Sequence, residues 1–196
     1  MKWKYGIQNP KFKDLDDKKI KDWLLQLKDL EHEFNLLGYE IYLYGGNLLG
    51  AIREGDVIST DDDFDIGWLC KSTTREQVKN EIKELYTHFK KKKLKCRTKQ
   101  LLGQAHIFSN KKDRHFDTWA SWFENDKFYF CFTIWGRFDK SILLPYKKVK
   151  IRGIEFNIPN KSETILKHLY GSDWKIKKDV KPIYDTNVFF KGEKFT

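Results

Sequence analysis

The spacing of apolar residues predicts three amphipathic helices. Over residues 16–37, apolar side chains recur every three or four positions, which predicts a helix that ends at Gly38. The same spacing predicts a helix over residues 72–91, and another over residues 162–170 that stops at Gly171. Each of these helices should bury one face against the rest of the protein.

The segments between and after these helices have the composition of strands. Residues 39–44 and 64–69 are rich in β-branched and aromatic side chains, and a short apolar segment at residues 48–52 between them predicts a small helix. Further strands are expected at residues 94–100, 104–109, 114–121 and 127–134, with a turn at residues 124–126, and in a hairpin at residues 147–151 and 154–158. This order of elements predicts an α+β fold, with a mixed α/β sheet flanked by helices.

Length and composition narrow the class of protein. A chain of 196 residues predicts a single domain over residues 1–196. The three cysteines, Cys70, Cys96 and Cys131, are widely spaced, which argues against a cysteine-built zinc site and fits a reducing compartment. The sequence shows no signal peptide and no membrane-spanning run, so we expect a soluble, cytoplasmic protein.

The charge balance favours an anionic partner. Lys and Arg number 38 against 28 Asp and Glu, for a net charge of +10. Such an excess suits a nucleotide, a phosphorylated glycan, a nucleic acid or an acidic membrane face, without choosing among them. A solvated, lysine-rich surface explains the charge equally well.

The candidate chemistry begins in the Asp-rich stretch at residues 61–65. Asp63 and Asp65 are two residues apart in a predicted strand, so both side chains should face the same way. Phe64 and Ile66 indicate that this strand is buried, where paired carboxylates are costly without a cation. We therefore expect one or two Mg²⁺ or Mn²⁺ ions here, although a solvated acidic loop remains the alternative.

Asp117 is the candidate for a third carboxylate, because it lies between bulky aromatic residues where packing alone does not explain it. It would hold a second ion or act as a general base; a paired strand residue is the alternative. His106 and His115 lie in nearby strand segments and are candidate bases, although a lone strand histidine is more often structural. Asp61 and Asp62 are expected in a loop as supporting residues.

A glycine turn before the short helix is the candidate phosphate site. Backbone N–H groups of Gly45, Gly46 and Asn47 can approach a phosphate without an intervening side chain. Arg53, on the same short helix, could bind diphosphate oxygens bidentately, or lie on the surface. Lys147, in the basic hairpin, could attract an anionic acceptor, or belong to a solvated surface.

Two sequence blocks resemble the LicD family, which also embraces fukutin and fukutin-related protein. The first is YGGNLLGAIREG at residues 44–55 with DDDFDIG at residues 61–67, and the second is IEFNIP at residues 154–159 with LYGSDW at residues 169–174. The resemblance extends over roughly residues 20–175. It departs from the usual pattern at Asn47, where Thr or Ser is common, and at Thr60, where Trp is usual.

The resemblance implies a nucleotidyltransferase-like fold and a metal-dependent phosphotransferase. Members move a phosphorylated alcohol, of the choline, glycerol or ribitol type, from a CDP-activated donor to a glycan hydroxyl and release CMP. By the resemblance of these motifs, Asp63 and Asp65 are expected to bind the metal ion, and Asp117 is a further expected ligand. In bacteria the glycan would be capsule, lipooligosaccharide or a teichoic-acid-like polymer, and the enzyme cytoplasmic or peripheral to the inner face of the membrane.

Two alternative functions are open, and the first uses the same aspartates. A true nucleotidyltransferase would transfer NMP to a small molecule or an RNA end, with attack at the α-phosphorus. A catalytically inactive module would use its basic surface to hold an anion. Nucleic acid is the less favoured partner, because Phe128, Tyr129 and Phe130 have the pattern of a core strand rather than of a stacking surface for bases.

Overall fold

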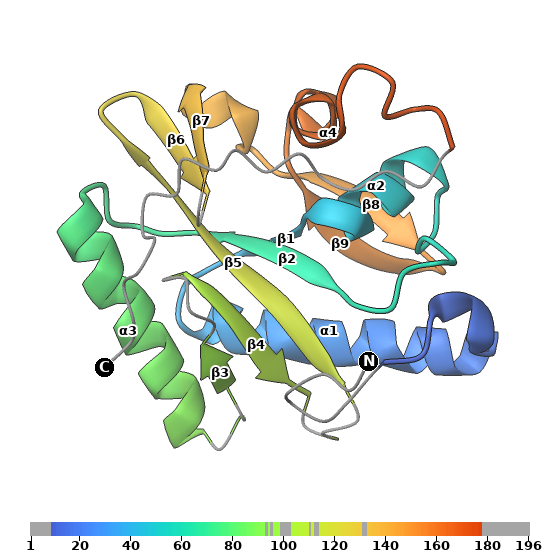
Figure 1. Cartoon of the computed structure of the whole chain (residues 1–196). Coiled ribbons are helices and arrows are strands. Elements are labelled where there is room, and N and C mark those ends of the chain that lie inside the picture. Colours follow the sequence, from blue (N-terminus) through green and yellow to red (C-terminus); the bar gives the residue numbers. More distant parts are fainter. Residues whose placement is uncertain are drawn as a thin grey trace.

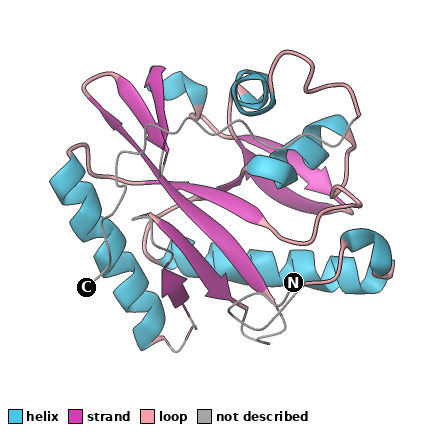
Figure 2. Ribbon diagram, in the orientation of Figure 1, coloured by secondary structure: helices cyan, strands magenta, loops and turns pink. Residues whose placement is uncertain are grey.

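A mixed sheet of seven strands forms the centre of the protein (Figures 1 and 2). The computed structural model describes residues 9–92, 94, 96–98, 103–109, 111, 114–130 and 133–177. The sheet has the order β1-β2-β5-β4-β3, and β6 pairs with both β5 and β7. Its strands are β1 (Ile41–Leu43), β2 (Asp65–Leu69), β3 (Cys96–Thr98), β4 (Gln104–Phe108), β5 (His115–Glu124), β6 (Lys127–Phe130) and β7 (Thr133–Arg137). Only β2 and β5 run parallel among these pairs.

Two long helices, α1 (Asp17–Leu36) and α3 (Arg75–Lys91), cover one face of this sheet (Figure 1). Phe34 of α1 packs against Trp68 of β2, with ring centroids 6.0 Å apart. On α3, the hydroxyl group of Tyr86 lies 3.3 Å from that of Thr118 on β5. Alternate residues of β2 and β5 therefore point into a buried core, and the residues between them point to the opposite face.

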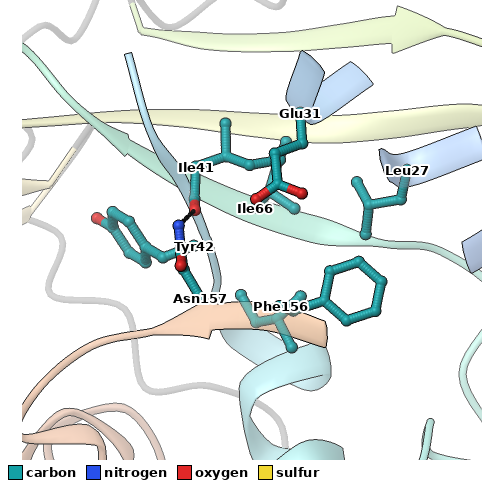
Figure 3. A pocket seen from close by; sticks show the side chains of 8 residues that line it. Leu27, Glu31, Ile41, Tyr42, Ile66, Phe156 and Asn157 are labelled. Atoms are coloured by element: carbon teal, nitrogen blue, oxygen red, sulfur yellow. Dashed lines mark hydrogen bonds between the residues drawn. The ribbon is translucent and has the colours of Figure 1, made fainter. Parts of the chain in front are cut away.

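The remaining elements gather around β1 and the start of β2 (Figure 1). They are α2 (Gly45–Arg53), α4 (Ser162–Tyr170) and a two-stranded sheet of β8 (Lys147–Ile151) and β9 (Ile154–Ile158), with short 3₁₀ helices η1 (Phe12–Asp14) and η2 (Lys140–Ile142). The side-chain amide of Asn157 on β9 donates to the carbonyl oxygen of Ile41 at 3.0 Å. A small gap beside this bond is lined by residues of α1, β1, β2 and β9 (Figure 3), and it includes none of the candidate site residues.

The aromatic ring of Tyr42 lies flat across Gly67. The two residues are partners in the β1–β2 ladder, and a Cβ atom on Gly67 would overlap ring atoms of Tyr42. The Tyr42 hydroxyl group lies 3.0 Å from that of Ser121, which in turn donates to the carbonyl oxygen of Trp68 at 2.9 Å. Tyr146 stacks on the ring at 5.4 Å between centroids. Absence of a side chain at Gly67 thus permits a contact that joins β1, β2 and β5.

The mixed sheet with flanking helices confirms the expected fold class. The helices expected at residues 16–37, 72–91 and 162–170 correspond to α1, α3 and α4. Phe128, Tyr129 and Phe130 are buried on β6, as expected for a core strand. Among the helices of the described residues, none has both the length and the apolar character needed to cross a bilayer.

Several boundaries differ from the expectation, and three of these differences bear on the site or on the sheet. The short helix α2 begins at Gly45 instead of residue 48. The strand expected over residues 127–134 is divided between β6 and β7, and Cys131 lies outside the described residues. Strand β2 begins at Asp65, so the expectation that Asp63 lies on a strand is wrong. The chain just before Asp63 is instead held by η1, because the backbone N–H of Phe12 donates to the carbonyl oxygen of Asp61 at 2.8 Å.

Candidate metal centre

The register of three strands brings the candidate residues to one face of the sheet. β5 lies between β2 and β4, and Asp117 is opposite Asp65 on β2 and opposite His106 on β4. Partners in adjacent strands point to the same side of a sheet, as do residues two apart on one strand. His115 therefore shares this face with the other three side chains. It is the face turned away from α1 and α3, and the start of α2 lies against it.

Three carboxylate groups form the centre of the site. Ligand oxygens of Asp63, Asp65 and Asp117 all lie within 4.8 Å of one another. Asp63 also forms a group of the same size with Asp61 and Asp62 in the preceding loop. The structure thus brings together the three residues expected as ligands, although Asp63 reaches the cluster from a loop. An all-oxygen set of this kind suits Mg²⁺, which binds a few carboxylates and completes its shell with water or phosphate.

Contacts from two further residues fix the position of Asp65. The indole N–H of Trp119 donates to Oδ1 of Asp65 at 2.9 Å. The side-chain oxygen of Asn47 accepts the backbone N–H of Asp65 at 2.5 Å. The sequence pattern predicted a role for the backbone N–H of Asn47 only, and it did not predict one for Trp119. The spacing of Trp119, two residues after Asp117, is the signal that places it on the same face.

The glycine turn lies directly against the carboxylates. Gly45 has a φ of +53°, and a Cβ atom there would lie 2.7 Å from Oδ2 of Asp65. A Cβ atom on Gly46 would overlap a carboxylate oxygen of Asp61. The N-terminus of α2, with backbone N–H groups that have no partner within the helix, thus faces a cluster of negative charge. The same geometry suits a phosphate group bound beside the ions.

The three carboxyl groups of Asp61, Asp62 and Asp63 have raised pKa values. Burial raises the pKa of Asp61 and of Asp62 above the ordinary value. The pKa of Asp63 is well above the ordinary value, first because of burial and then because of the nearby charges of Asp65 and Asp61. Cations bound here would remove this repulsion, so the residues present fit a divalent metal ion.

A first test follows from the raised pKa of Asp63. Because the folded chain holds this proton more tightly than the unfolded chain, the metal-free protein should lose stability as pH rises from about 4 through the raised value. Mg²⁺ or Mn²⁺ should restore it, most strongly at neutral pH. At 100 times the dissociation constant, mass action adds about 2.7 kcal/mol, or roughly 5–10 °C in melting temperature.

Differential scanning fluorimetry at pH 5 and pH 7.5, with EDTA or added ion, measures both effects. The variant Asp63→Asn should melt higher than the parent protein in EDTA at pH 7.5 and gain less from the ion. Equal ion effects in parent and variant would contradict the placement of the ion beside Asp63.

Arg53, one of the expected site residues, lies apart from the carboxylates. Arg53 is at the opposite end of α2 from Gly45, roughly 12 Å along the helix axis. It donates to Oε1 of Glu54 at 2.7 Å, and its buried Nε and Nη1 atoms have no hydrogen-bond partner among the described residues. Lys147 is exposed on β8. Phosphate binding by Arg53 and acceptor attraction by Lys147 stay predictions.

Comparison with known proteins agrees with this arrangement. Residues 38–161 match the family model described as LicD/FKTN/FKRP, nucleotidyltransferase domain. This segment contains α2, β2 and β5, and with them every carboxylate of the cluster. An uncharacterized protein of Rickettsia typhi is 26% identical over 142 residues, which cover 72% of this chain and 43% of that protein. The aligned part of the chain therefore spans less than half the length of this curated relative.

Proposed function

Because the chain belongs to the LicD/FKTN/FKRP nucleotidyltransferase-domain family, we propose that it is a metal-dependent phosphotransferase with a CDP-activated donor. The phosphorylated alcohol, of the choline, glycerol or ribitol type, would pass to a hydroxyl group of a cell-surface glycan such as capsule, lipooligosaccharide or a teichoic-acid-like polymer. The reaction would take place in the cytoplasm or at the inner face of the membrane. The observation that carries this proposal is the cluster of Asp63, Asp65 and Asp117 beside the N-terminus of α2.

Some residues of the site would bind the ions and the donor phosphate, and others orient Asp65. Asp63, Asp65 and Asp117 would hold one or two Mg²⁺ or Mn²⁺ ions, which neutralise charge on the diphosphate and on the leaving group when bound. The backbone N–H groups of Gly45 and Gly46 would bind a donor phosphate. Trp119 and the Asn47 side chain keep Asp65 directed into the site.

The transfer itself is an in-line displacement at the β-phosphorus. The oxygen of the acceptor hydroxyl forms a bond to this phosphorus, while the bond from phosphorus to the CMP phosphate oxygen breaks and CMP leaves with its electron pair. The proton of the hydroxyl passes to Asp117 if this carboxylate is free to act as a base, or to solvent if it is bound to an ion.

The test compares two classes of donor. The protein is incubated with Mg²⁺ and CDP-choline, CDP-glycerol, CDP-ribitol or an NTP, and products are followed by ³¹P NMR, with water as a slow acceptor. CMP released from a CDP-alcohol supports the proposal. Pyrophosphate released from an NTP would identify a nucleotidyltransferase instead. Binding of donors without either product would indicate the inactive module.

A further inference from the structure

We propose that His106, His115 and Asp117 form a second cation site, which takes a transition-metal ion such as Co²⁺, Zn²⁺ or Mn²⁺. This site rests on the proposed function, because it shares Asp117 with the all-oxygen cluster. The metal centre would then hold a pair of ions with different ligands. One position would be bound by oxygen ligands alone and the other by two imidazole nitrogens and a carboxylate.

The ligand atoms are already assembled. Nδ1 of His106 lies 2.8 Å from Oδ1 of Asp117, and Nε2 of His115 lies 3.7 Å from the same oxygen. One ligand atom from each of the three residues lies within 4.8 Å of the other two. An ion about 2.1 Å from each ligand requires neighbouring ligands roughly 3–3.4 Å apart and opposite ligands roughly 4.2 Å apart. Small side-chain rotations are enough to reach this geometry.

The backbone explains why these three residues meet. His106 and Asp117 are direct partners in the antiparallel ladder between β4 and β5, and His115 precedes Asp117 by two residues on β5. The imidazole rings of the two histidines lie side by side, with centroids 4.5 Å apart. Side chains of one face of a sheet thus supply all three ligands, which fixes their directions before an ion arrives.

The site is open on one side. The side chains of His106 and His115 are 19% and 18% exposed, whereas that of Asp117 is 6% exposed. An ion can therefore enter past the histidines and keep open positions for water or a substrate oxygen, as in metal sites with three protein ligands. A carboxylate shared by two ions is a common bridge at separations of about 3.5–4 Å.

Ligand chemistry separates the two positions. Imidazole nitrogen suits Zn²⁺ and Co²⁺, and Mn²⁺ binds it more weakly, whereas Mg²⁺ prefers oxygen ligands. The alternative is that His106 only orients Asp117 through a hydrogen bond, with no ion bound to nitrogen. In the proposed site, Asp117 acts as a ligand, and the acceptor proton then leaves to solvent.

Pulsed electron paramagnetic resonance of Mn²⁺ bound to the full chain distinguishes these cases. Histidine ligation should give ¹⁴N modulation of the electron spin echo, and protein labelled with ¹⁵N-histidine should replace it with the ¹⁵N pattern. The labelled protein needs no substitution, so the test does not depend on whether a variant folds. Absence of nitrogen modulation at saturating Mn²⁺ would overturn the proposal.

Variants then locate the signal. The double variant His106→Gln and His115→Gln should lose the nitrogen modulation and weaken the corresponding Mn²⁺ affinity about tenfold or more. His32→Gln, an exposed histidine on α1, is the matched control and should leave both unchanged. An unchanged nitrogen signal in the folded double variant would also overturn the site.

The test of the histidine site and the test of the proposed function can give different results. Asp63→Asn should weaken the oxygen-bound ion and keep the nitrogen-bound one. Nitrogen modulation in a protein that releases no CMP would support the histidine site and contradict the proposed CDP-activated donor. CMP release without nitrogen modulation would support the donor and contradict the histidine site.

Discussion

Replacing Asp65 with asparagine is expected to lower the turnover number for CMP release by about 10³-fold or more. The substituted amide keeps the shape of the carboxylate, and its oxygen can still accept the indole N–H of Trp119, now at 2.9 Å from Oδ1. It loses the negative charge and a ligand oxygen at the centre of the cluster. Because electrostatic stabilisation by bound ions is central to phosphoryl transfer, the loss should fall on turnover.

The measurement is the rate of CMP release from the CDP-alcohol that the parent protein uses, at saturating Mg²⁺. Circular dichroism should show an unchanged fold. Asp29→Asn, on the exposed side of α1, removes the same charge far from the carboxylate face and should retain full activity. Full activity of both Asp65→Asn and Asp63→Asn would refute the metal assignment.

Substituting alanine for Gly67 is expected to lower the free energy of unfolding by about 3 kcal/mol. The added methyl group would occupy space now filled by the ring of Tyr42, which is fully buried and stacked on Tyr146. The ring cannot move without giving up its hydroxyl contact with Ser121. Overpacking in a dense interior costs about 1–3 kcal/mol, and the loss of this contact adds to it.

Urea denaturation measures this change, and a fall in melting temperature of roughly 6–12 °C should accompany it. Gly55→Ala is the control, because a Cβ atom there meets nothing within 4 Å and the positive φ of +70° alone should cost about 1 kcal/mol. Combining Gly67→Ala with Tyr42→Ala should be less harmful than the sum of the single changes. Simple additivity would show that the ring is not the obstacle.

The sequence predicts the long elements of the fold because each has a strong period. Helix α1 and helix α3 bury one stripe, and the alternation of Phe64 to Trp68 marks β2 as a strand with two different faces. The same alternation identified Asp65 as a candidate, whereas Asp117 was identified by its position between bulky aromatic residues. The alternation placed Asp63 on the strand as well, because residue spacing alone does not reveal that η1 holds the preceding loop.

The pairing between strands cannot be predicted from the local pattern of apolar and polar residues. Nothing within the β4 segment indicates that His106 is opposite Asp117, since the partner is set by the packing of the whole sheet. The hydrogen bond from Asp65 to Asn47 likewise joins residues 18 positions apart. Residue spacing also does not give the length and direction of α2, which place Arg53 at the opposite end of this helix from Gly45; its contact with the diphosphate stays a prediction.

The opposition of Asp65, Asp117 and His106 across β2, β5 and β4 also links ion binding to the order of folding. A shift of β5 by one residue against its neighbours would turn Asp117 and His115 into the apolar core and leave Asp65 without its partner. The parallel contact between β2 and β5 joins segments about 50 residues apart, and contacts of this kind form late. Divalent ions can therefore stabilise only chains whose central strands are correctly paired, so they should slow unfolding more than they speed folding.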